Sequence, residues 1–204
     1  MISIGGENLI DLVSGDPAAN GLPQYVANPG GSPFNVAMAA GRQGQQVAYL
    51  TPVSEDALGE LLAERLEESR VSLATPRVAH PTSLAVVSIS DGIPSYAFHR
   101  NGTAERQVTK QNLHRDMPAE TQLFHVGSLG LIEGADADTW EEFFRDCQGR
   151  GIITSLDPNV RAGLISDSDA YVARLRRMMR HADIFKLSDE GPCLLYTSDA
   201  ADDP

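Results

Sequence analysis

The sequence has 204 residues, and 28 Asp and Glu against 16 Lys and Arg give a formal net charge of −12. This balance argues against nucleic acid and anionic membranes as partners, because a negative surface repels both. No apolar stretch approaches the roughly 20 residues of a membrane-spanning helix, and the N-terminus lacks a basic leader. The two cysteines are too few for a disulfide framework and have no metal-ligand spacing. We therefore expect a cytoplasmic protein.

Short apolar runs alternate with helical patterns along most of the chain, which is typical of strands joined by crossover helices. This alternation predicts an α/β fold with a mostly parallel sheet. Apolar spacing predicts helices between the strands, for instance from Asp56 to Arg70. Buried strands are expected at residues 1–6, 45–51, 121–127, 151–157 and 182–187.

Two segments interrupt this alternation. Residues 10–28 are rich in Gly, Pro and Asn, and residues 82–104 contain two strand patterns around the turn signal Asp91-Gly92. We expect these segments to form a small, separate antiparallel sheet. Such a sheet can act as a lid over the carboxyl ends of the core strands, where open α/β sheets bind ligands.

The segment GGSPFNVAMAAGRQG, residues 30–44, predicts a glycine turn followed by a helix. Ser32 is in the right place for an N-cap and Pro33 for the first helical position. Gly30 and Gly31 allow a ligand to approach the backbone, and the Asn35 amide can bind hydroxyl groups. A tight turn before a packing helix explains the same pattern without any ligand.

Polar residues at predicted strand ends are further candidates. Asp11 follows the apolar pair Leu9-Ile10, where a carboxylate can accept hydrogen bonds from sugar hydroxyls, although turns and caps also use Asp. Arg100 closes the second strand of the predicted lid and can hold an anionic or polyol substrate from above. A solvated strand end is the alternative.

The segment SLDPNVR places Asp157, Asn159 and Arg161 at alternate positions after a predicted strand, an arrangement that suits phosphate binding. Asp-Pro-Asn is also common turn chemistry. The segment KLSDE brings Ser188 to the same sheet edge, where it can equally be a helix N-cap.

Together these segments resemble the ribokinase or PfkB family of carbohydrate kinases, with bacterial fructokinases most similar and 2-keto-3-deoxygluconate kinases next. The resemblance runs from residue 1 to about 190 in the family's order. It is carried by the segments GENLIDLV, GGSPFNVA, VSEDALG, FHRNGTA, SLDPNVR and KLSDE.

The resemblance implies a ribokinase-like, three-layer α/β/α core with a small β-sheet lid. It implies ATP-dependent phosphorylation of a sugar primary hydroxyl with Mg²⁺, converting fructose to fructose 6-phosphate or acting on 2-keto-3-deoxygluconate, and a possible homodimer through the lid. By the same resemblance, sugar-binding positions are Asp11, Gly30, Gly31, Asn35, Phe98 and Arg100. Positions toward the phosphates and nucleotide are Asp157, Asn159, Arg161 and Ser188.

The family's catalytic base is an Asp in a Gly-x-Gly-Asp loop, and this sequence has no such motif. We therefore assign no catalytic residue and no metal ligand within the chain. We expect residues 1–190 to form a kinase domain whose C-terminal part is missing, and residues 191–204 to be a non-native tail. The alternative for the chain by itself is a non-catalytic sugar-binding or folding-defective fragment.

Overall fold

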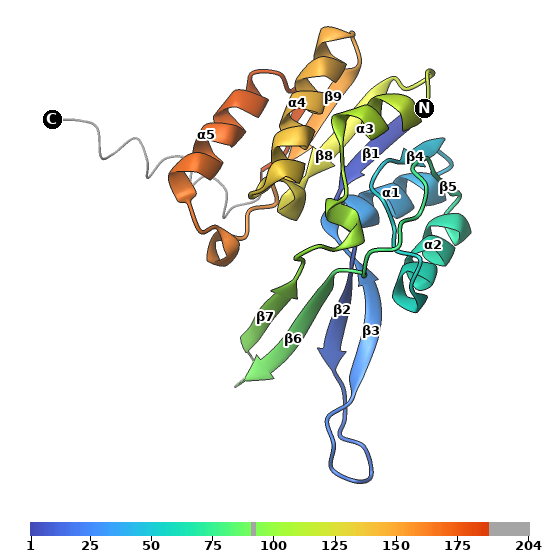
Figure 1. The fold of residues 1–204 in the computed structure, drawn as a ribbon, viewed down its shortest axis with the longest axis vertical. Helices are drawn as coiled ribbons and strands as arrows, with labels where there is room; N and C mark the ends of the chain where they lie inside the picture. The colour runs from blue at the N-terminus through green and yellow to red at the C-terminus, as the bar shows by residue number, and fades with distance from the viewer. Residues whose placement is uncertain (91–92, 188–204) are drawn as a thin grey trace, which may run out of the picture.

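The computed structural model describes residues 1–90 and 93–187, and its centre is a six-stranded sheet of parallel strands (Figure 1). The strand order is β10-β9-β8-β1-β4-β5. The strands are β1 (Ile2–Gly6), β4 (Val47–Tyr49), β5 (Val71–Leu73), β8 (Leu123–Gly127), β9 (Ile153–Asp157) and β10 (Ile184–Phe185). Five of them confirm predicted strands. The predictions for Ser188 and for residues 191–204 lie outside the described residues.

Helices cover both faces of this sheet and complete the three-layer arrangement. One face packs on α1 (Ser32–Arg42) and α2 (Ala57–Glu68). The other packs on α3 (Lys110–Asp116), α4 (Ala135–Gly149) and α5 (Ser168–Met179). Short 3₁₀ turns are η1 (Ala104–Arg106), η2 (Ser128–Leu131) and η3 (Ala162–Leu164). No helix within 1–90 and 93–187 is long and apolar enough to cross a membrane.

Successive residues of β1 lie on opposite faces of the sheet, so the strand contacts both layers of helices. Ile4 is fully buried among the side chains of α1 and α2. Its neighbour Gly5 faces α4, where a Cβ on Gly5 would lie only 2.4 Å from the Trp140 ring. The large indole therefore packs directly on the strand backbone.

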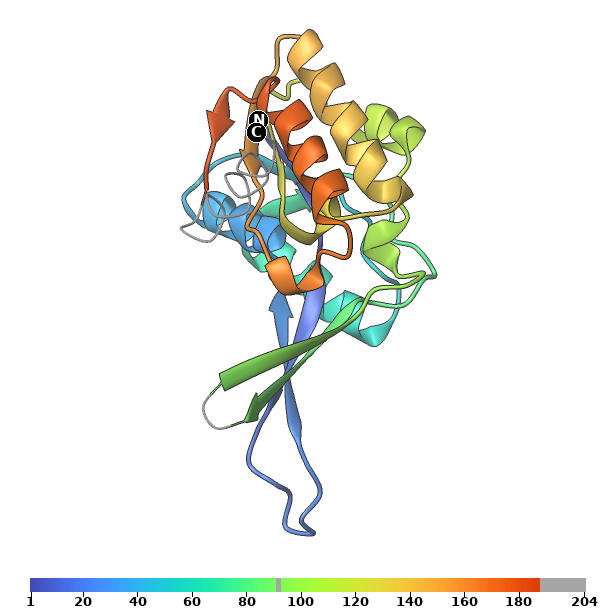
Figure 2. The same ribbon diagram turned by 90° about the vertical axis from the view of Figure 1, so that its left-hand side faces the viewer.

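The lid is a separate four-stranded sheet that projects from one end of the core (Figure 2). Its order is β3-β2-β6-β7, with β2 (Leu9–Ser14), β3 (Tyr25–Gly30), β6 (Leu84–Ser90) and β7 (Ile93–His99). The β2–β3 and β6–β7 pairs are antiparallel, but β2 and β6 are parallel. The expectation of a wholly antiparallel sheet is therefore wrong. The chain between β3 and β6 first builds α1, β4, α2 and β5, and such a long crossover permits parallel pairing.

The start of α1 also differs from the prediction. Gly31, with φ of 109°, is the N-cap, and Ser32 is already helical. A glycine has no side chain with which to cap the helix. The side chain of Glu7 takes that role from another part of the chain, because its Oε1 accepts the Ser32 N–H at 2.8 Å.

The ends of β8 and β9 approach too closely for a side chain at Gly127. A Cβ there would lie 1.9 Å from the Asp157 carbonyl oxygen, which belongs to the backbone and has little freedom to move. We expect Gly127→Ala to lower the free energy of unfolding by about 2 kcal/mol or more, as overpacking does. Gly149→Ala is the matched control, since nothing lies within 4 Å of that Cβ position. Urea denaturation of both variants tests this, and equal stabilities would contradict it.

Candidate functional site

A cleft of about 790 Å³ lies where the lid meets the carboxyl ends of the core strands. Its walls come from β2 and β7 of the lid, the first turns of α1, and the ends of β8, β9 and β10. Most of the site residues proposed from the sequence meet here. Those that line the cleft are Asp11, Gly31, Asn35, Phe98, Asp157, Asn159 and Arg161.

The lid supplies a carboxylate and two aromatic rings. Asp11 lies in the middle of β2 rather than after a strand, and partial burial raises the pKa of this carboxyl. Phe98 lines the same cleft and stacks on Tyr96, with ring centroids 6.0 Å apart. A carboxylate beside aromatic faces can hold a ring that carries hydroxyls, since it offers hydrogen-bond acceptors and an apolar surface together. Sequence reasoning missed Tyr96, although it lies two residues before Phe98 in the same strand and therefore on the same face of the lid.

The two adjacent glycines serve different purposes. Gly30 does not line the cleft, but a Cβ there would lie 2.3 Å from Oδ2 of Asp11, so its missing side chain leaves room for that carboxylate. Gly31 has a φ of 109°, and a Cβ on it would lie 2.6 Å from the Glu7 carbonyl oxygen. Its left-handed backbone and the close approach of Glu7 both require glycine.

The opposite end of the cleft carries positive charge in an otherwise acidic protein. Asp157 ends β9, and its Oδ2 accepts a hydrogen bond from Lys186 Nζ at 2.7 Å. Arg161 and the amide of Asn159 line the same wall. Sequence reasoning did not single out Lys186, although it begins the KLSDE segment. Two cations and an amide around one bound carboxylate are a suitable setting for phosphate oxygens.

Backbone strain marks this end as well. Asn159 has a φ of 40° and Ser128 a φ of 60°, and Nδ2 of Asn159 donates to Oγ of Ser128 at 3.3 Å. Left-handed non-glycine residues cost free energy and concentrate at functional sites. Ser128 was missed because the dihedral angles after a strand cannot be inferred from the residue types.

His125 contributes a neutral side chain to the cleft. It lies within β8, is largely buried, and its Nδ1 forms a hydrogen bond of 3.0 Å with Oγ of Ser155. Burial lowers the pKa of His125, with nearby Asp157 opposing the shift, so the ring is uncharged at neutral pH. A single histidine in an apolar strand offers no sequence signal for this position.

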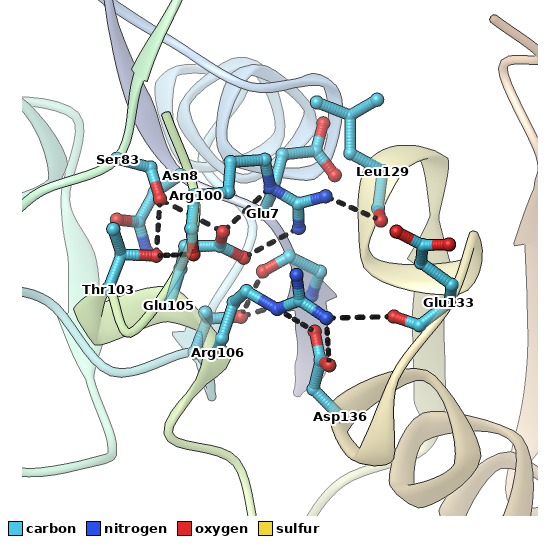
Figure 3. A network of polar contacts seen from close by, with 12 residues as sticks. Glu7, Asn8, Ser83, Arg100, Thr103, Glu105, Arg106, Leu129, Glu133 and Asp136 are labelled. Atoms are coloured by element: carbon cyan, nitrogen blue, oxygen red, sulfur yellow. Dashed lines mark hydrogen bonds and ion pairs between the residues drawn. The ribbon is translucent and has the colours of Figure 1, made fainter. Parts of the chain in front are cut away.

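Arg100 lies at the root of the lid, between Glu105 and Leu129 (Figure 3). It does not line the cleft with Asp11. Its Nε and Nη2 donate to the carboxylate of Glu105 at 2.8 and 3.0 Å, and its Nη1 donates to the Leu129 carbonyl at 3.0 Å. The resemblance assigns Arg100 to the sugar; in the structure its guanidinium is bound to the buried Glu105 carboxylate. Sequence reasoning missed Glu105, whose distance from Arg100 is set by the turn between them.

Comparison with known proteins shows which family the chain belongs to. The model of the pfkB family of carbohydrate kinases matches residues 3–191. The chain belongs to the pfkB family of carbohydrate kinases.

Relatives in this family include fructokinases. The chain is 37% identical over 194 residues to a fructokinase of Rhizobium leguminosarum bv. trifolii, covering 93% of this chain and 58% of the relative. It is 32% identical over 204 residues to fructokinase-2 of Oryza sativa subsp. japonica, covering 97% of this chain and 60% of the relative. The chain thus spans about three fifths of the length of these pfkB family members.

A solved structure agrees with the fold. The fructokinase of Xylella fastidiosa with bound ATP superposes with a TM-score of 0.89 at 28% identity, covering 98% of this chain and 64% of the other. The three-layer core and the lid are therefore the family's fold. The cleft lies at the carboxyl ends of the core strands, which is where open α/β sheets in general bind ligands.

Within residues 1–90 and 93–187, no group of three or more His, Cys, Asp or Glu is placed to hold a metal ion. Mg²⁺ is commonly held by one or two carboxylates together with substrate phosphates and water. Asp157 is the carboxylate at the cationic end of the cleft, so the residues there fit an ion that is held together with a phosphate group. Such an ion would supply neutralisation of phosphate charge there.

The Arg100–Glu105 pair has a testable energetic consequence. The side chains are 12% and 1% exposed, so Arg100→Met leaves a buried carboxylate without its cation. We expect a loss of about 3 kcal/mol or more in the free energy of unfolding. Arg65→Met is the control, since it breaks the exposed Arg65–Glu68 pair and should cost under about 1 kcal/mol. Similar losses for both variants in urea denaturation would show that Arg100 does not anchor the lid.

Proposed function

We propose that the whole protein containing this chain transfers the γ-phosphoryl group of ATP to a primary hydroxyl of fructose, which gives fructose 6-phosphate. The observation that carries this proposal is the cleft, which joins a hydroxyl-binding end at the lid to a cationic end at the core strands. The 37% identity to a fructokinase supports fructose as the sugar. The ATP-bound fructokinase with the same fold supports ATP as the phosphoryl donor.

At the lid end, the chain would bind the sugar through Asp11 and Asn35. Both side chains face the cleft, and carboxylate and amide oxygens accept hydrogen bonds from hydroxyl groups. The aromatic pair Tyr96 and Phe98 would exclude water from one side of the ring. Together they would fix the orientation of the sugar, on which the rate of phosphoryl transfer depends.

At the core end, Arg161 and Lys186 would attract and orient the phosphates, with Asn159 as a neutral donor beside them. Phosphoryl transfer offers little covalent chemistry for side chains, so positioning and charge neutralisation supply most of the acceleration. ATP would bring Mg²⁺ with it. Ser188 is proposed to lie toward the nucleotide on the resemblance alone.

The catalytic base is proposed to lie outside these 204 residues, in a Gly-x-Gly-Asp loop of the whole protein. The chain would then contribute the sugar pocket and part of the phosphate site. By itself it would bind sugar without turning it over.

The proposal is tested by measuring ADP release with fructose, 2-keto-3-deoxygluconate and no sugar, and by identifying the phosphorylated product. We expect fructose-dependent ADP release from the whole protein and fructose 6-phosphate as product. A higher kcat/KM for 2-keto-3-deoxygluconate would contradict fructose as the substrate. Turnover by the isolated 204-residue chain would contradict a base outside it.

Replacing Asp11 by Asn removes the charged acceptor and keeps the shape of the side chain. We expect KM for fructose to rise about tenfold or more, because a hydrogen bond to a charged group contributes about 1.5–3 kcal/mol. KM for ATP should change little, since Asp11 lies at the lid end. Asp16→Asn on the exposed lid loop is the control. An unchanged KM for fructose in Asp11→Asn would remove Asp11 from the sugar site.

The lid is also proposed to join two copies of the protein. Val26 and Tyr96 are 56% and 54% exposed, and the strand register places both on the same face of the lid as Asp11. An apolar strip of this kind on a projecting sheet is costly in water and suits a second, identical lid.

The lid contact predicts that Val26→Asp dissociates the dimer, since a charge would be buried against the partner's apolar face. Met179→Asp on the outer side of α5 should leave it intact. Sedimentation velocity distinguishes the two states. A wild-type monomer, or a Val26→Asp variant that stays dimeric, would reject the lid interface.

A further inference from the structure

Glu7 is a buried acid that the proposed reaction does not use. It lies between β1 and β2 and is only 1% exposed, yet it borders the cleft. Its Oε1 accepts the backbone N–H of Ser32, and its Oε2 has no hydrogen-bond partner among the described residues. A fully buried carboxyl with an unpaired oxygen is costly, so the hydrogen bond that its other oxygen makes is important for keeping it in place.

The hydrogen bond to Ser32 is the side-chain cap of α1. The N-cap residue is Gly31, which has no side chain, and the next residue but one is Pro33, which has no N–H. The backbone of Glu7 is itself held in place, because the Tyr49 hydroxyl donates a hydrogen bond to the Glu7 carbonyl oxygen at 3.0 Å. The turn from Gly31 to Asn35 is therefore bound to Glu7, whose own position is fixed by Tyr49.

The surrounding charges leave Glu7 free for this role. Arg100 lies beside it, but the guanidinium is bound to Glu105 and Leu129 (Figure 3). The ion pair of Arg100 is therefore with Glu105, and its charge acts on Glu7 only as an electrostatic attraction. Burial raises the pKa of Glu7, which favours the neutral acid, while Arg100 opposes the shift and Glu105 adds to it. A neutral acid still accepts the Ser32 N–H through Oε1.

We propose that Glu7 is a positioning residue for sugar binding, which sets the place of Gly31 and Asn35 in the cleft by capping α1 from the link between β1 and β2. This inference rests on the proposed sugar-kinase function. Its physical basis is that the α1 turn forms one wall of the cleft, while the carboxyl of Glu7, which is 1% exposed and borders the same cleft, accepts the first N–H of that turn. A shift of the turn would move the Asn35 amide relative to the sugar, and small displacements cost large factors in rate.

Two substitutions separate the cap from other effects. Glu7→Met keeps the length and burial of the side chain but removes the acceptor, and Glu7→Gln keeps the acceptor oxygen. We expect kcat/KM for fructose to fall about tenfold to a hundredfold in Glu7→Met, with KM for ATP within about twofold of wild type. Glu7→Gln should stay within about threefold. Glu64→Met, at an exposed acid on α2, is the control.

A third variant removes the same hydrogen bond from its other end. Ser32→Pro deletes the donor N–H at the first helical position, where proline is tolerated. It should reproduce the Glu7→Met defect, and the double variant should be no worse than either single one. Additive losses would overturn the cap as the cause. So would a Glu7→Met variant that is less stable but has an unchanged KM for fructose.

Hydrogen exchange tests the positioning without relying on activity. In Glu7→Met, amides in residues 31–36 should exchange faster than in wild type, and in Glu7→Gln they should not. Unchanged exchange in Glu7→Met would overturn the inference even if the whole protein phosphorylates fructose. If Glu7→Met exchanges faster but the wild-type protein does not turn over fructose, the proposed function is rejected, while the role of Glu7 as the cap of α1 is supported. Glu7→Gln also remains as a folded comparison if Glu7→Met does not fold.

Discussion

The buried ion pair between Arg100 and Glu105 ties the lid to the core, and the cleft depends on that attachment. Arg100 follows the last lid strand, Glu105 lies in the first turn after it, and the same guanidinium holds the Leu129 carbonyl beside β8. Each partner would be costly to bury alone, so separating the pair at the root of the lid carries a free-energy penalty. The walls of the cleft come from the lid and from the core, which this pair joins.

The core brings its backbones together at glycines, and this determines where ligands can approach. Trp140 packs on Gly5, the ends of β8 and β9 meet at Gly127, and the Glu7 carbonyl lies against Gly31. Strand pairing aligns Gly6 of β1, Gly127 of β8 and Asp157 of β9 at the carboxyl end of the sheet. The residues that follow these strands then converge at the cleft, as the geometry of a parallel sheet requires.

Much of the fold could be predicted from patterns because strands and helices have different periods. Five core strands and the two lid segments were predicted in this way, whereas β5 was not, since Val71–Leu73 is too short to show a period. The direction of β6 beside β2 was also predicted incorrectly. Pairing direction depends on the path of the intervening chain, which residue alternation within a strand does not encode.

The sequence by itself determined the family and most of the polar residues at the cleft, because Asp11, Asn35, Asp157 and their neighbours occur in motifs with characteristic local spacing. Only the tertiary structure decided which of these groups meet a partner. Arg100 is turned toward Glu105, α1 is capped by Glu7, and Lys186 binds Asp157. The reason is physical: periodicity specifies the face on which a side chain lies, whereas its charged or hydrogen-bonded partner comes from a segment brought near only by packing.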